Sequence, residues 1–340
     1  MLSETDLEFV HALQEAPRAS WNLLAQVLET DARTVARRYV RLRDEGQIRV
    51  VATLGPRMLA EAHWAHLRAR TLPGQALTVA RQLAEWPQAA SVRVTDGAFE
   101  VYAWLTGLDA RTLWRSTQEG IARIPQIVRA DMQTVVESLD IGRAERLDVL
   151  SARQVAALRR QQVPPTPPGH EATRFSEADA ELWRLLADGR MEVARAADHL
   201  GRSPSAVSRR IARLQADGYL DFVTMIAEPL SSAPHAALIW CRIDPDELGL
   251  LQRHRAELHW AGLLSVATGR SNVMAMANLT TLGSLNAVIA QLRAVCPSVE
   301  IHDTQLSAQA VKRHSRMVTD EELWTDEITN PYPDLSRAFE

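Results

Sequence analysis

The chain has 340 residues, of which 46% are hydrophobic and 24% charged, and its formal net charge is −4. This composition is typical of globular domains with packed cores, and the length predicts two to four such domains. The slightly acidic balance argues against nonspecific coating of nucleic acid, although local basic faces remain compatible with a sequence-specific binder.

The targeting and metal-binding signals that can be read from a sequence are absent. No run of about 18 apolar residues occurs, so we expect no transmembrane helix. The polar, acidic start of the chain does not resemble a secretory signal. Cys241 and Cys296 have neither metal-binding nor redox spacing and are expected to be buried. We therefore expect a cytoplasmic protein with no cofactor, metal or membrane partner.

The sequence repeats itself at an offset of 172 residues. The matched pairs include Val35 and Val207, Arg37 and Arg209, Gly46 and Gly218, Gly97 and Gly269, and Pro125 and Pro297. One offset kept from Val35 to Val136 predicts two tandem copies of one unit. Prolines fix φ and lack an N–H, so the proline-rich segment 163–169 is predicted to be a semi-rigid linker between the copies.

The first third of each copy predicts a helix-turn-helix. In copy one, helix two covers about 21–28 and helix three 31–45, with Val35, Tyr39 and Leu42 facing inward. In copy two, the first helix begins after Ser176 and the second covers 192–200. The third covers 204–217 behind Ser203-Pro204, which suits a helix start. A β-hairpin wing is expected to begin near 47–50 in copy one and to cover 219–225 in copy two.

Polar and basic side chains occupy the outer face of each third helix. The candidate DNA contacts are Arg33, Thr34, Arg37, Arg38 and Arg41 in copy one, and Ser203, Ser205, Ser208, Arg209, Arg210 and Arg213 in copy two. The major groove admits one helix, and arginine can contact phosphate or guanine with two hydrogen bonds. A solvated charged face on an ordinary helix is the alternative, but two copies with aligned arginines favour duplex DNA as the partner.

The rest of each copy predicts a small α/β domain with the order βαββαβ, which is the ferredoxin-like split unit. In copy one the elements cover 63–70, 75–85, 90–94, 99–105, 110–123 and 127–136. In copy two they cover 235–243, 245–258, 262–267, 273–279, 282–295 and 299–306. Because such a sheet leaves one face open, we expect the two halves to pair within the chain or each half to pair with another chain.

The predicted fold class is α+β. The expected domains are a winged helix-turn-helix over 1–55, a ferredoxin-like domain over 60–140, a connecting helix and linker over 141–173, a second winged helix-turn-helix over 174–228, a second ferredoxin-like domain over 233–316, and an acidic tail over 317–340. We expect the tail after Thr319 to be poorly ordered or to lie over a neighbour.

This arrangement resembles the Lrp/AsnC (feast/famine) family of regulators. The residues that carry the resemblance are Ser203-Pro204-Ser205, Arg209-Arg210 with Leu214 and Gly218, and the turns at Thr95-Asp96-Gly97 and Thr268-Gly269. The resemblance implies dimerisation through the α/β sheets and a small effector, such as an amino acid, bound between them. The effector candidates it implies are Thr95, Asp96, Gly97, Phe99, Glu100, Thr268, Gly269, Ser271 and Asn272. Copy two lacks both the aromatic and the acidic residue of the family's Gly-x-Tyr-Asp-like segment.

Two other functions remain as alternatives. Siroheme decarboxylases share this architecture, but segments 62–67 and 234–240 lack the Asn-x-Met-x-Val-Trp-like strand that this resemblance would require. An architectural DNA-binding role without any effector is the other alternative. The sequence therefore predicts a homo-oligomeric, sequence-specific DNA-binding transcription regulator that is not an enzyme.

Overall fold

The computed structural model describes residues 2–107, 109–141, 147–160, 163–164, 175–255 and 257–329. Most of the predicted linker (165–169) and the end of the predicted tail (330–340) lie outside these residues. The chain divides into two compact units. Unit 1 contains Met1–Glu61, Ala144–Leu230 and Asp334–Glu340, and unit 2 contains Ala62–Arg143 and Ser231–Pro333. No helix in the described part of the chain is long and apolar enough to cross a membrane.

Unit 1 contains two sets of three helices, and each set is followed by a strand. The first set is α1 (Glu4–Glu15), α2 (Trp21–Val27) and α3 (Ala32–Asp44), followed by β1 (Ile48–Leu54) and the short α4 (Pro56–Glu61). The second set is α8 (Glu177–Leu185), α9 (Val193–Leu200) and α10 (Pro204–Ala216), followed by β6 (Leu220–Ile226) and the short η1 (Glu228–Leu230). The third helix of each set agrees with the sequence prediction to within two residues.

The two strands of unit 1 pair with each other rather than forming separate wing hairpins. β1 and β6 are antiparallel, with Val51 opposite Val223. The prediction of a hairpin after each third helix is therefore corrected, because the partner strand comes from the other set. Glycine permits this close approach: a Cβ on Gly55 would lie 2.3 Å from the carbonyl oxygen of Gly218.

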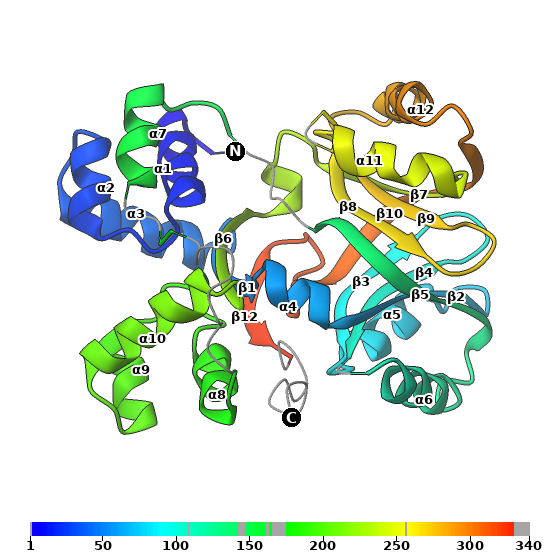
Figure 1. Cartoon of the computed structure of the whole chain (residues 1–340), viewed down its shortest axis with the longest axis horizontal. Helices are drawn as coiled ribbons and strands as arrows, with labels where there is room; N and C mark the ends of the chain where they lie inside the picture. The colour runs from blue at the N-terminus through cyan, green and yellow to red at the C-terminus, as the bar shows by residue number, and fades with distance from the viewer. Residues whose placement is uncertain are drawn as a thin grey trace. The chain divides into compact units, whose positions relative to one another are not determined.

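Helix α7 (Ala152–Arg159) falls within the predicted linker region but packs into the core of the first set. Ser151 begins it with a capping box to Gln154, and the Gln154 side chain also donates to the Val27 carbonyl oxygen at 2.9 Å. Arg159 pairs with Glu15 of α1 at 2.7 Å, and α1 and α7 lie side by side (Figure 1). The segment is therefore a fourth helix of this domain rather than a connector.

Unit 2 contains the order βαββαβ twice. The first half is β2 (His63–Thr71), α5 (Ala76–Ala84), β3 (Ala89–Thr95), β4 (Val101–Gly107), α6 (Ala110–Ile121) and β5 (Ile127–Ile141). The second half is β7 (His235–Arg242), η2 (Pro245–Glu247) with α11 (Leu248–His254), β8 (Ala261–Ala267), β9 (Val273–Leu279), α12 (Ser284–Val295) and β10 (Glu300–Arg313). These elements match the predicted ranges, although β5 and β10 extend several residues further.

Because β5 and β10 are long, each of them pairs with strands of both halves and joins the two halves into one sheet. The first part of β5 pairs with β2, and its second part pairs with β8 of the other half. Likewise β10 pairs first with β7 and then with β3. The strands therefore form a closed ring in the order β10-β3-β4-β2-β5-β8-β9-β7. The sequence left open whether the two halves pair within the chain or each pairs with another chain, and here they pair within the chain.

Alternation along the strands gives this barrel an outer and an inner layer. Alanine, valine and leucine side chains form the outer layer. Helices α5 and α6 cover it in the first half, and α11 and α12 cover it in the second (Figure 1). The inner layer contains the buried cluster Tyr102, Leu238, Trp240, Leu263 and Met274. The inside of the barrel is thus lined by large side chains from both halves.

The last described elements are β11 (Arg316–Val318) and β12 (Trp324–Ile328), which extend the sheet beyond β10. The tail after Thr319 was expected to be poorly ordered or to lie over a neighbour, and within the described residues it instead forms β12 at the edge of the sheet. Trp324 accounts for the difference, because its ring is 3% exposed and lies 4.9 Å from the Arg313 guanidinium. One buried aromatic side chain anchors a segment whose overall composition is acidic.

Candidate nucleic-acid interface

Helix α3 is held by its N-cap and by one apolar stripe. The carboxylate of Asp31 accepts hydrogen bonds from the Thr34 amide at 2.8 Å and the Thr34 hydroxyl at 2.7 Å. The predicted inward residues Val35, Tyr39 and Leu42 are all buried. The opposite face leaves Arg33 and Arg37 exposed, and neither pairs with any carboxylate in the described residues.

Helix α10 follows the same pattern with different chemistry at its start. The Ser203 hydroxyl accepts from the Ala206 amide at 3.3 Å, and Pro204 occupies the first turn, where no N–H partner is needed. The predicted inward residues Val207, Ile211 and Leu214 are buried. On the outer face Ser205, Ser208 and Arg209 are exposed, and the Arg209 guanidinium is without an ion pair within the described ranges.

Two arginines of α3 that were predicted to face DNA instead connect α3 to α1. Arg41 pairs with Asp6 at 2.6 Å, and Arg38 lies 3.6 Å from the same carboxylate and donates to the Thr5 carbonyl oxygen at 2.7 Å. Burial acts to raise the pKa of Asp6, but hydrogen bonds from Ser3 and Arg41 hold it below its ordinary value. Arg38 and Arg41 therefore also hold α3 against α1, and their contact with DNA stays a prediction.

The second set repeats this use of arginine. Arg210 pairs with the buried Asp179 of α8, and Arg213 pairs with Asp217 at 2.8 Å. Burial acts to raise the pKa of Asp179, but the hydrogen bonds from Arg210 and Ser176 keep it below its usual range. Arg210 and Arg213 therefore make ion pairs within the domain, and their contact with DNA stays a prediction. The exposed candidates that make no ion pair in the described residues are Arg33 and Arg37 on α3 and Ser203, Ser205, Ser208 and Arg209 on α10.

Sequence reasoning missed two arginines that join the helix sets. Arg18 donates to the Met191 carbonyl oxygen at 3.1 Å and also to that of Gly189, and Arg190 donates to the carbonyl oxygens of Pro17 and Ala19, both at 2.9 Å. Burial lowers the pKa of Arg190 to about 10. The signal was present in the sequence, because Arg18 and Arg190 are themselves separated by 172 positions.

The first predicted effector segment is the β3–β4 turn, and its polar atoms already have partners. Gly97 has a φ of +85°, which favours glycine. The Leu306 amide donates to the Asp96 carboxylate at 2.7 Å, and the Thr71 amide donates to Glu100 at 2.9 Å. From the other half, Gln305 donates to the carbonyl oxygens of Asp96 and Phe99 at 3.0 and 2.6 Å. Thr95 donates its hydroxyl proton to the Phe99 carbonyl oxygen at 2.8 Å.

The second predicted effector segment, the β8–β9 turn, is held in the same way. Gly269 has a φ of +102°, and with the Gln133 side-chain amide turned so that its nitrogen faces the turn, that nitrogen donates to the carbonyl oxygens of Thr268 and Ser271 at 3.1 Å. The Asn272 side chain accepts from the Ile243 amide at 2.9 Å and donates to its carbonyl oxygen at 2.8 Å. In each half, a glutamine from the other half therefore reaches the predicted effector turn.

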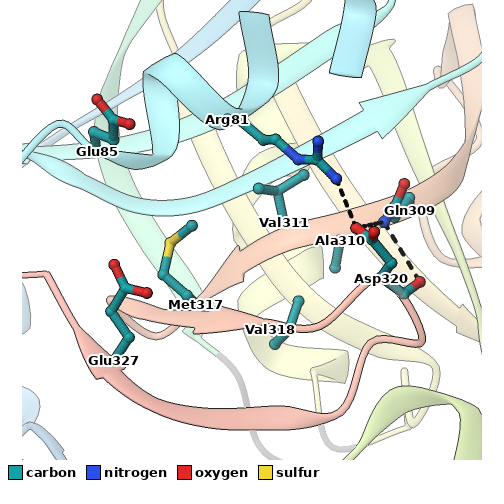
Figure 2. A pocket seen from close by; sticks show the side chains of 9 residues that line it. All are labelled: Arg81, Glu85, Gln309, Ala310, Val311, Met317, Val318, Asp320 and Glu327. Atoms are coloured by element: carbon teal, nitrogen blue, oxygen red, sulfur yellow. Dashed lines mark hydrogen bonds and ion pairs between the residues drawn. The ribbon is translucent and has the colours of Figure 1, made fainter. Parts of the chain in front are cut away.

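A surface hollow of about 200 Å³ lies between α5, β10 and the β11–β12 extension. Figure 2 shows Arg81 of α5 reaching Asp320, at 2.8 Å, with Gln309 beside them. The remaining lining residues are Glu85, Ala310, Val311, Met317, Val318 and Glu327. The hollow is smaller than the roughly 300–1,000 Å³ typical of small-molecule sites, and we assign no ligand to it.

Comparison with known domains and structures identifies both helix sets. Residues 2–43 match the AsnC-type helix-turn-helix domain, and residues 182–221 match a winged helix-turn-helix DNA-binding domain. No curated protein matches the chain.

Two solved structures of one enzyme show the same fold at low identity. The siroheme decarboxylase NirDL has a TM-score of 0.60 at 12% identity, over 92% of this chain and 93% of that chain. Its co-complex with an iron-uroporphyrin III analogue has a TM-score of 0.59 at 12% identity, over 99% of this chain and 100% of that chain. The structure of E. coli AsnC has a TM-score of 0.35 at 14% identity, over 40% of this chain and 93% of that chain.

These structures correct one expectation. The expectation that the chain is not an enzyme is contradicted, because an enzyme has the same fold over nearly the whole chain. The fold therefore does not separate a regulator from a decarboxylase. The chain carries an AsnC-type helix-turn-helix domain and a winged helix-turn-helix DNA-binding domain within the fold of the siroheme decarboxylase NirDL.

Proposed function

We propose that the chain is a sequence-specific DNA-binding regulator of AsnC type, formed from two fused copies of one unit. The observation that carries the proposal is the exposure of Arg33, Arg37 and Arg209 on the outer faces of α3 and α10, opposite their buried stripes. Within segments that match helix-turn-helix domains, such arginines suit phosphate or guanine contacts in the major groove.

The test is a selection of duplexes from a random library by the full chain, followed by affinity measurements over a salt series. Replacing Arg37 and Arg209 together with alanine should weaken binding to the selected duplex. Each phosphate contact that is lost should make the slope of log K against log salt shallower by about 0.9. Arg115→Ala is the matched control, because Arg115 is an exposed arginine on α6 with no ion pair in the described part of the chain. Unchanged affinity and slope in the double variant would contradict this interface.

A second candidate is a decarboxylase that acts on a siroheme-type tetrapyrrole. The likeness to NirDL over 92% of this chain favours it. The test is incubation of the purified chain with siroheme, with absorbance spectra and mass spectrometry to detect loss of carbon dioxide. Turnover would support this candidate, and unmodified siroheme together with operator binding would support the regulator.

A small effector at the two turns stays a prediction. To bind at the β3–β4 turn, it would displace the Gln305 amide from the carbonyl oxygens of Asp96 and Phe99. A thermal-shift screen of amino acids tests the prediction, because a ligand of the native state raises the melting temperature with concentration.

A further inference from the structure

The outer faces of α3 and α10 differ, although the two helices occupy equivalent places in the repeat. At the offset of 172, Arg33 corresponds to Ser205 and Ala36 to Ser208, whereas Arg37 corresponds to Arg209. All of these except Ala36, which is partly buried, are exposed. The two helices therefore share one central arginine but present different groups in their first turns.

The helices are held as a pair by contacts that obey a local two-fold relation. Val51 lies opposite its equivalent Val223, and the pair of Val50 with Thr224 is matched by the equivalent pair of Phe222 with Ala52, so the register of β1 with β6 is symmetric about Val51. The reciprocal contacts of Arg18 and Arg190 follow the same relation. A symmetric joint thus presents two helices that are not chemically equivalent.

The first turn of a recognition helix contributes contacts to base edges, so this difference affects sequence readout. Arg33 can donate two hydrogen bonds to O6 and N7 of guanine. A serine hydroxyl, which both donates and accepts, fits several bases. A dimer with two identical recognition helices binds a palindromic operator, because the operator has the same two-fold symmetry as the protein. Since α3 and α10 differ in their first turns, this chain has no such symmetry to require a palindrome.

We infer that the partner is a duplex with two non-identical half-sites, in which the half-site under α3 contains a guanine read by Arg33. The half-site under α10 lacks this requirement and is read by Ser205, Ser208 and Arg209. This inference rests on the proposed DNA-binding function, and it adds that the chain binds its operator in one orientation.

The experiment uses the full chain and the operator recovered by selection, together with two palindromes that duplicate either half-site. We expect the natural operator to bind more tightly than both palindromes. Arg33→Ser should weaken binding to it by about tenfold, since a good bidentate contact discriminates between bases by about ten- to a hundredfold. In this variant, replacing the guanine of the α3 half-site should cost nothing further. Ser205→Arg should create a guanine preference in the other half-site.

Arg33 and Ser205 are exposed, so their replacement should preserve folding, and thermal melts check this. Arg115→Ser is the control, because Arg115 is also exposed but lies on α6. A palindromic operator in which substitution of either half-site costs the same would overturn the inference while leaving DNA binding in place. Failure to select any duplex would instead overturn the proposed function.

Discussion

The imidazole of His66 is completely buried inside the barrel, at the contact between the two halves. One ring nitrogen lies 3.0 Å from the Tyr102 hydroxyl in its own half, and the other lies 2.7 Å from the Ser265 hydroxyl in the second half. Burial, with a smaller contribution from the charge of Arg68, lowers the pKa of His66 to about 3. The ring is therefore neutral in the folded protein, and its hydrogen bonds connect the halves.

His66 should make the protein sensitive to acid. Between pH 6.5 and about pH 3 the unfolded chain binds a proton at this position and the folded chain does not, so stability falls as the pH falls. The loss is about 1.4 kcal/mol per pH unit, or about 2 kcal/mol between pH 6.5 and pH 5. We expect urea unfolding to show this loss in the native chain and a smaller one in His66→Gln. Equal losses in both proteins would show that His66 does not cause the acid sensitivity.

The arginines show what a sequence pattern can and cannot say about a single residue. Helical spacing correctly placed Val35, Tyr39 and Leu42 in the core, because burial follows the period of one helix. It could not separate Arg37 from Arg41, because the carboxylate that pairs with Arg41 belongs to Asp6 of a different helix. Ion pairs between elements depend on packing that local periodicity does not encode.

Among the elements, the chain directly after β1 passes close to the chain directly before β6, at Gly55 and Gly218. A Cβ on Gly55 would meet the Gly218 carbonyl carbon at 2.6 Å and its oxygen at 2.3 Å, and backbone atoms cannot rotate away. We expect Gly55→Ala to destabilise unit 1 by about 1–3 kcal/mol, as overpacking does. Differential scanning calorimetry of the native chain and of Gly55→Ala can measure this loss of stability.

Gly249→Ala is the matched control, because Gly249 lies in α11 and a Cβ there meets nothing within 4 Å. Alanine favours helix, so this variant should be neutral or slightly more stable. A Gly55→Ala variant as stable as the native chain would mean that β1 and β6 can separate at little cost.

The sequence predicted where helices and strands lie better than it predicted which of them pair or pack together. The βαββαβ order in both halves came from alternation and turn residues, which are local signals. The pairing of β1 with β6 was not predicted, because both strands also fit a hairpin wing and the register is fixed by the other copy. Helix α7 was assigned to a connector because its burial depends on Leu150 and Leu158 reaching the core of a distant segment.

In the whole molecule, neither half of the sequence supplies all the strands of unit 1 or of unit 2. Unit 1 takes β1 from the first copy and β6 from the second, and the barrel of unit 2 needs β5 to reach β8 and β10 to reach β3. Each copy alone would leave the second part of a long strand unpaired, and unpaired strand edges promote association. The whole chain pairs these strand edges internally.

Cutting the chain within the proline-rich segment tests this dependence. Fragments 1–164 and 170–340 should each lack native near-ultraviolet circular dichroism, because the inner cluster combines Tyr102 from the first with Trp240 and Leu263 from the second. Mixing them in equal amounts should restore the signal and give a one-to-one complex by light scattering. This mixed complex should be more stable than homodimers of either fragment, since Gln305 donates to the carbonyl oxygens of Asp96 and Phe99, and His66 contacts Ser265, only when both fragments are present. Fragments that fold fully alone, with no change on mixing, would show that the copies are independent domains.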